Sequence, residues 1–342
     1  LDGVATNTGV YDVNSDLTVG DLTVTGAFEA TGTIKLDGNY PTGTCNVALG
    51  DNALGSGSLS GDFNTAVGTN ALLANTSADA NTAIGRSSLC SNTTGNCNTG
   101  LGMNALLGNT EGFGNVAVGR SSMVANTTGD NNVAVGQNSL VSNTTADNNT
   151  AVGTCSLTAN TTGNANTAVG ITSLQANTTG ANNVAVGRCA LYSNTTASDN
   201  TAVGVSSMGL TTTGCQNTAV GQQSLRTNST GDNNTALGFY ALCSNTTADN
   251  NTAVGFCSLK TNSTGANNTA VGRFALLLNQ TGATNTAVGQ NSLHSNTTAA
   301  DNTAVGAGSL YTNTTGATNT AVGKNALCAN QTASNNTAIG KS

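Results

Sequence analysis

The sequence predicts an all-β fold, a parallel β-solenoid (β-roll) built from 17-residue coils. A glycine recurs every 17 residues from Gly68 to Gly340, and it closes a phrase that usually reads Asn-Thr-Ala-Val-Gly. A fixed period of this length indicates one structural unit stacked on itself. Because stacked units place equal residues above one another, the strands are expected to run parallel and in register.

Helices are excluded by three features of the unit. Its apolar residues do not recur at the 3.6-residue spacing of a helix face. Gly, Asn and Thr, which are poor helix formers, fill roughly half of its positions. The Asn-Thr-Thr-Gly phrase, as in residues 92–95, is typical of turns because Asn and Gly tolerate left-handed φ angles.

The elements of one unit follow from its residues in order. We number the unit from its glycine, so that Gly68 stands at position 1 and Ile84 at position 17. One strand is expected over Thr-Ala-Val-Gly and a second around the Ser-Leu pair at positions 4 and 5. Turns are expected near positions 1 to 3 and 8 to 13. The Asn residues at positions 8 and 14 are expected to form side-chain amide ladders along the stack.

The adjacent pairs Ala-Val and Ser-Leu place apolar or small side chains on both faces of a strand, since neighbouring strand residues point in opposite directions. We expect Val and Leu to fill the coil interior. Ala at position 16 and Ala or Ser at position 4 are then expected to contact an identical chain closely. The sequence therefore predicts self-association of identical chains around a shared axis.

Two regions are predicted along the chain. Residues 1–44 do not follow the period, and Leu17–Gly26 is a short quasi-repeat with strand-like alternation, so this part is expected to be a β-rich shaft or connector. Residues 45–342 are expected to form the solenoid. Its first coil has 18 residues, with one residue inserted before Gly68.

Composition excludes several partners. Only 7% of the residues are charged and the net charge is −7, which argues against a nucleic-acid partner because such a partner requires clustered Lys and Arg. No 18-residue apolar run occurs, so no membrane insertion is expected. The nine cysteines scatter over several columns of the repeat and are expected to be mostly free thiols, which fits assembly in a reducing cytoplasm.

No catalytic, cofactor or metal site is predicted, and the chain is not expected to be an enzyme. The single histidine, His294, has no acid or nucleophile at a fixed offset. Paired-carboxylate chemistry needs two acids at a set separation in a cleft, which a uniform roll does not offer. The Asp column at position 12 lacks the Gly-Gly-x-Gly-x-Asp phrase of calcium-binding rolls; its members include Asp130, Asp147, Asp232 and Asp249.

One candidate contact patch stands out among the variable positions 2, 3 and 6. Aromatic residues and one arginine gather there on three successive coils, namely Phe239, Tyr240, Phe256, Arg273 and Phe274. Aromatic planes beside a guanidinium can stack on the sugar rings of a host surface, so this patch is a possible receptor contact. The alternatives are that these side chains pack in a groove between chains, or that they lie on the coil rim without a binding role.

The phrase Asn-Thr-Ala-Val-Gly-x-x-Ser/Ala-Leu, as at residues 166–174, resembles the Asn-Ser-Val-Ala-Ile-Gly-x-x-Ala repeats of trimeric autotransporter adhesin heads. Those heads are left-handed parallel β-rolls arranged as trimers. The longer unit with Asn-Thr-Thr-Gly, and the Leu-Thr-Val-Gly phrase at residues 17–20, more closely resemble bacteriophage tail-fibre proteins.

The resemblance implies a structural fibre in the tail of a virion. Its implied partners are two further copies of itself in a homotrimer, other tail or fibre proteins, and a polysaccharide or protein receptor on the host cell. The alternative is a bacterial cell-surface adhesin or extracellular filament built from the same roll. A third hypothesis is an ice-binding solenoid, because threonine columns recur at positions 9, 10 and 15.

Overall fold

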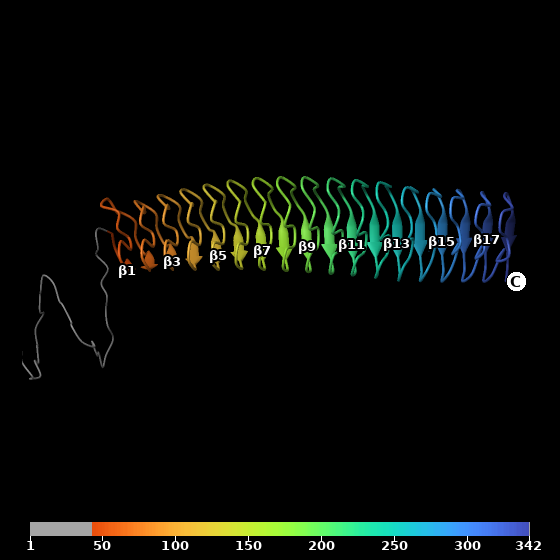
Figure 1. The fold of residues 1–342 in the computed structure, drawn as a ribbon, viewed down its shortest axis with the longest axis horizontal. Helices are drawn as coiled ribbons and strands as arrows, with labels where there is room; N and C mark the ends of the chain where they lie inside the picture. The colour runs from red at the N-terminus through yellow and green to blue at the C-terminus, as the bar shows by residue number, and fades with distance from the viewer. Residues whose placement is uncertain (1–42, 342) are drawn as a thin grey trace, which may run out of the picture. The chain divides into compact units, whose positions relative to one another are not determined.

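The computed structural model describes residues 43–341, which form a parallel β-solenoid of about 17 coils with roughly 17 residues each and no helix. Eighteen strands lie in a single row in chain order (Figure 1). The predicted shaft over residues 1–44 lies outside the described residues except for its last two. The strands are β1 (Val47–Leu49), β2 (Thr65–Val67), β3 (Thr82–Ile84), β4 (Thr99–Leu101), β5 (Val116–Val118), β6 (Val133–Val135), β7 (Thr150–Val152), β8 (Thr167–Val169), β9 (Val184–Val186), β10 (Thr201–Val203), β11 (Thr218–Val220), β12 (Thr235–Leu237), β13 (Thr252–Val254), β14 (Thr269–Val271), β15 (Thr286–Val288), β16 (Thr303–Val305), β17 (Thr320–Val322) and β18 (Thr337–Ile339).

Each strand pairs in parallel with the next, and equal positions of the unit face one another. Thr150 of β7 lies opposite Thr167 of β8, for example, one full period further along the chain. The pairing of β1 with β2 absorbs the inserted residue, because Val47 lies opposite Thr65. The predicted parallel, in-register stack is confirmed.

The glycine at position 1 is required by the close approach of neighbouring coils. Gly187 has a φ of +133°, a conformation that residues with a side chain rarely adopt. A Cβ on Gly187 would lie 2.6 Å from the carbonyl oxygen of Gly204 in the next coil. Glycine therefore recurs every 17 residues because position 1 of each coil has no room for a side chain.

The coil interior differs from the prediction. Away from the two ends of the stack, Leu or Met at position 5 is fully buried as expected, but so are Ala at position 16 and Ala or Ser at position 4. The hydroxyl of Ser88 donates to the carbonyl of Gly100 at 2.8 Å, so positions 4 and 16 face each other across the inside of one coil. Strand alternation then turns Thr at position 15 and Val at position 17 outward. The expectation that Val fills the interior, while Ala and Ser contact a sister chain, was wrong.

The second predicted strand is also absent from the described residues. Position 5 has a left-handed φ, +48° at Leu174, and position 3 has +55° at Thr172, so this segment is a series of turns. Its main chain still joins both neighbouring coils. The Leu174 amide donates to the carbonyl of Ala190 at 3.0 Å, and the Thr172 amide donates to that of Thr154 at 3.1 Å.

Both predicted amide ladders are present. At position 8, Asn126 Nδ2 donates to Asn109 Oδ1 at 2.7 Å and to the carbonyl of Gly129 at 2.9 Å. At position 14, Asn166 Nδ2 donates to Asn149 Oδ1 at 3.2 Å, and the main-chain N–H of Asn166 donates to the same oxygen at 2.9 Å. The ladders thus satisfy buried polar groups within the stack, where an unpaired group would be costly.

The ladder at position 8 is interrupted once, at Thr211. The hydroxyl of Thr211 and Oδ1 of Asn194 in the preceding coil are both buried without a hydrogen-bond partner. In the following coil, Asn228 Nδ2 keeps its bond to the carbonyl of Gly231 at 2.7 Å. Threonine is too short to accept and donate along this column as asparagine does.

Candidate functional site

The variable surface of the solenoid is formed by positions 2, 3 and 6 of each coil, which we call the rim. Position 3 of one coil lies beside position 6 of the next, as the 5.3 Å from Lys260 Nζ to the Tyr240 ring centre demonstrates. Position 2 is mostly exposed, and positions 3 and 6 are mostly half-buried. Side chains on the rim are therefore held on one side and accessible on the other.

The structure brings together the aromatic residues of the predicted patch. The Phe239 ring lies 4.3 Å from that of Tyr240 and stacks on Phe256 of the next coil at 5.5 Å, with an angle of 9° between the ring planes. Phe256 in turn meets Phe274 edge-on at 5.4 Å. These offset and T-shaped arrangements are the preferred geometries of aromatic pairs.

Two further rings continue the row beyond the predicted patch. Phe274 lies 6.5 Å from His294, and His294 stacks on Tyr311 at 4.9 Å. Sequence reasoning missed them because the row moves from position 2 to position 3 and then to position 6. Only the contact between positions 3 and 6 of neighbouring coils, which the sequence does not reveal, could have linked them.

Two cations pack on this row. Arg273 lies with its guanidinium carbon 4.5 Å from the Phe274 ring centre, and Lys260 lies above Tyr240. Such cation–π contacts stabilise the pair and hold the charge in place. Burial lowers the pKa of His294, which favours the neutral imidazole in its stack with Tyr311.

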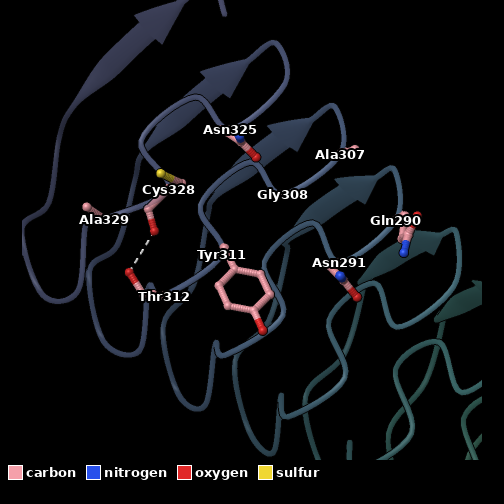
Figure 2. A pocket seen from close by; sticks show the side chains of 9 residues that line it. All are labelled: Gln290, Asn291, Ala307, Gly308, Tyr311, Thr312, Asn325, Cys328 and Ala329. Atoms are coloured by element: carbon pink, nitrogen blue, oxygen red, sulfur yellow. Dashed lines mark hydrogen bonds between the residues drawn. The ribbon is translucent and has the colours of Figure 1, made fainter. Parts of the chain in front are cut away.

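A groove of about 620 Å³ adjoins the Tyr311 end of the row (Figure 2). It exists because the coil that begins at Gly306 carries Ala307 and Gly308, the smallest side chains, at positions 2 and 3. Tyr311 forms one side of the groove, and polar side chains supply hydrogen-bonding groups around it. Its lining is Gln290, Asn291, Ala307, Gly308, Tyr311, Thr312, Asn325, Cys328 and Ala329.

A smaller groove of about 150 Å³ repeats this arrangement on an earlier part of the rim. Gly209 stands at position 6 of one coil, and Tyr192 stands at position 6 of the coil before it. Arg226 lines the same groove. Both grooves therefore form where a rim residue is glycine, and both are bordered by a tyrosine.

The Asp column at position 12 has a main-chain role. Asp147 Oδ1 accepts the amide hydrogen of Asp130 at 2.8 Å, and Asp130 Oδ1 accepts that of Phe113 at 2.9 Å. Over residues 43–341, no group of three or more His, Cys, Asp or Glu side chains is placed to hold a metal ion. The nine cysteines are all unpaired, as expected.

The threonine column at position 9 is also used inside the stack. The Thr127 hydroxyl donates to the carbonyl of Thr144 at 3.0 Å, and this bond recurs in other coils. The position-9 column therefore does not present the free hydroxyls that the ice-binding hypothesis requires of it, whereas Thr at position 15 faces outward. No helix in the described part of the chain is long and apolar enough to cross a membrane.

The fold defines the class of the protein as a β-solenoid repeat protein. No model of a known protein family matches the chain, and no curated protein is significantly similar to it.

Proposed function

We propose that this chain is a structural fibre of a phage tail, a rigid homotrimeric rod that carries host-receptor binding. The proposal is supported by the resemblance of the repeats to tail-fibre sequences and by the uniformity of the coils. Equal hydrogen bonds recur from coil to coil along the stack, so the solenoid has no evident hinge within residues 43–341. Rigidity of this kind suits a part that holds a binding surface away from a particle.

The observation that supports self-association is the outer face of the 18-stranded sheet, formed by positions 15 and 17, which we call the sheet face; the number of three chains rests on the resemblance. Every residue in its two columns is Thr, Val, Ile or Leu, and none is charged. Several of the position-17 side chains are substantially exposed, including Ile84 at 38%, Leu101 at 43% and Val220 at 39%. A continuous uncharged face of this kind marks an interaction surface.

The size and period of the sheet face favour a second copy of the same chain as its occupant. At about 4.8 Å per strand the face is roughly 80 Å long and about 10 Å wide, or on the order of 800 Å². That is the area which each partner buries in a standard interface. A sister chain has the same rung spacing, so its columns match along the whole length. The proposed contact between chains therefore uses Thr and Val.

The mass of the protein in solution tests the assembly. The purified chain should have three times the mass of one chain by light scattering. Val203→Lys with Val220→Lys, which place charges on the sheet face, should shift it to monomer. Val205→Lys, a change to the same residue at rim position 2, should leave the trimer intact. A wild-type monomer at micromolar concentration would contradict the proposal.

The location needs a separate measurement. Gold-labelled antibodies against the chain should bind the tails of virions in lysates of cultures that carry the gene. Labelling of the bacterial envelope instead would support the adhesin or extracellular filament.

A further inference from the structure

We propose that the rim between Phe239 and Tyr311 binds an acidic polysaccharide. This inference deepens the proposed function, since it rests on a role of the rod in attachment and names the chemistry of the receptor. It is carried by three observations, which are the distribution of charge, the aromatic row and the groove.

Charge is segregated between two turns of the coil. All eight Lys and Arg residues within 43–341 stand at positions 2 or 6, on the rim: Arg86, Arg120, Arg188, Arg226, Lys260, Arg273, Lys324 and Lys341. Nine of the ten acidic residues in the same range stand at positions 10 to 13: Asp62, Asp79, Glu111, Asp130, Asp147, Asp199, Asp232, Asp249 and Asp301. The rim is thus the basic side of a chain whose net charge is −7, and it favours an anionic partner.

The aromatic row points to a polymer of sugar units. Six rings follow one another over coils that begin at Gly238 to Gly306, so apolar planes recur along the direction of the stack. Such planes accept the apolar faces of flat, polar ligands. Lys260 and Arg273 lie within this row and can pair with carboxylates on the same ligand. A chain-like acidic glycan can use both features along the axis.

The groove supplies hydrogen-bonding groups at the end of the row. Tyr311 borders it, and the side-chain amides of Gln290 and Asn291 line it. Asn291 Oδ1 is buried without a hydrogen-bond partner. Rotation of that amide would offer the unmet acceptor to a sugar hydroxyl, and a buried acceptor gains from such a partner. The side chains seen in Figure 2 thus form a polar site beside an aromatic ring.

Binding of the purified full chain to immobilised polygalacturonate tests the proposal, with dextran as the uncharged control polymer. The wild type should bind polygalacturonate and not dextran, and binding should weaken as salt rises, because salt screens exposed charges. Phe256→Ala and Arg273→Ala should each weaken binding about tenfold, the effect of one good aromatic or cationic contact.

Two matched variants control for general effects. Phe113→Ala removes a ring that is as exposed as Phe256, 48% against 45%, but that lies in the acidic turn. Arg120→Ala removes an arginine at the same position 2 as Arg273, nine coils away. Both should bind like the wild type. Melting curves should show all four variants folded, because rim side chains do not contribute to the coil interior.

Four results would overturn the proposal. The first two are equal binding by all four variants and equal binding to dextran. The third is no binding of the wild type to polygalacturonate, alginate and hyaluronan. The fourth is a protein receptor that binds the rim when no glycan does. None of these results changes the mass in solution or the virion labelling, so the fibre role is judged separately.

Discussion

The coil interior and the rim follow opposite rules. Interior positions keep one or two residue types throughout the stack, as Leu174 at position 5 and Asn166 at position 14 illustrate. Rim positions change from coil to coil, from Tyr240 to Cys257 to Phe274 at position 3. An interior side chain contacts the equivalent side chains in the coils on both sides, so a side chain of the wrong size or polarity destabilises three coils. A rim side chain has solvent on one side and can vary. Stability therefore resides in the interior, and specificity resides on the rim.

The largest expected effect is the loss of a position-1 glycine, which lies against the main chain of the next coil. Gly187→Ala should destabilise the local coils by about 3 kcal/mol or more, because the new Cβ meets the main chain of Gly204 and φ is unfavourable for alanine. Limited proteolysis should then cut near residue 187, and the melting temperature should fall. Gly57→Ala is the control, because nothing lies within 4 Å of a Cβ at that exposed site. Equal protease resistance of both variants would show that coil spacing adapts easily.

A smaller effect, an increase in stability, is expected at Thr211, where the interior asparagine column at position 8 is interrupted. Thr211→Asn should stabilise the chain by about 1–3 kcal/mol, because the new side-chain N–H can donate to the unpaired Oδ1 of Asn194 and restore the ladder. Asn160→Thr should cost a similar amount, since Asn160 now bonds Asn143 and Asn177 in an intact ladder. Hydrogen exchange of amides near each site measures both changes. No slowing of exchange in Thr211→Asn would mean that the ladder adds no net stability.

The smallest effect is expected on the rim, at His294. Burial lowers the pKa of its imidazole, so the folded chain takes up this proton at lower pH than the unfolded chain. The stability that it contributes is complete above the unfolded pKa of about 6.5 and is lost as pH falls through the folded value. His294→Phe should therefore lose less stability than the wild type between pH 7.5 and 5.5. Identical pH dependence of the two melting temperatures would contradict this account.

The period made much of the fold predictable. A glycine at every seventeenth residue fixes the coil length and the in-register pairing, and asparagine in the same columns predicts the ladders. The direction of the side chains was not predictable from hydrophobicity. Ala168 and Val169 are both apolar, and only the narrow space opposite Ser156 in the same coil decides that Ala168 points inward. Leu174 was mistaken for a strand residue because its left-handed φ is unusual for leucine.

The candidate site was predictable only within single columns. Phe239 and Phe256 share position 2, so their contact follows from the stacking. His294 joins the row because position 6 of its coil lies beside position 3 of the coil that carries Phe274. Which columns touch depends on how the turns fold, and turns with left-handed residues leave little trace in the hydrophobic pattern. The groove likewise depends on which neighbours flank Gly308.

The in-register pairing has a consequence for how such genes change. Because every coil offers the same backbone edge above and below, one complete repeat can be duplicated or deleted by recombination without disturbing its neighbours. Each event would alter the reach of the protein by about 4.8 Å, in fixed increments. Each duplication or deletion would also create new pairs of neighbouring side chains on the outer surface, while the backbone of the coils stays the same.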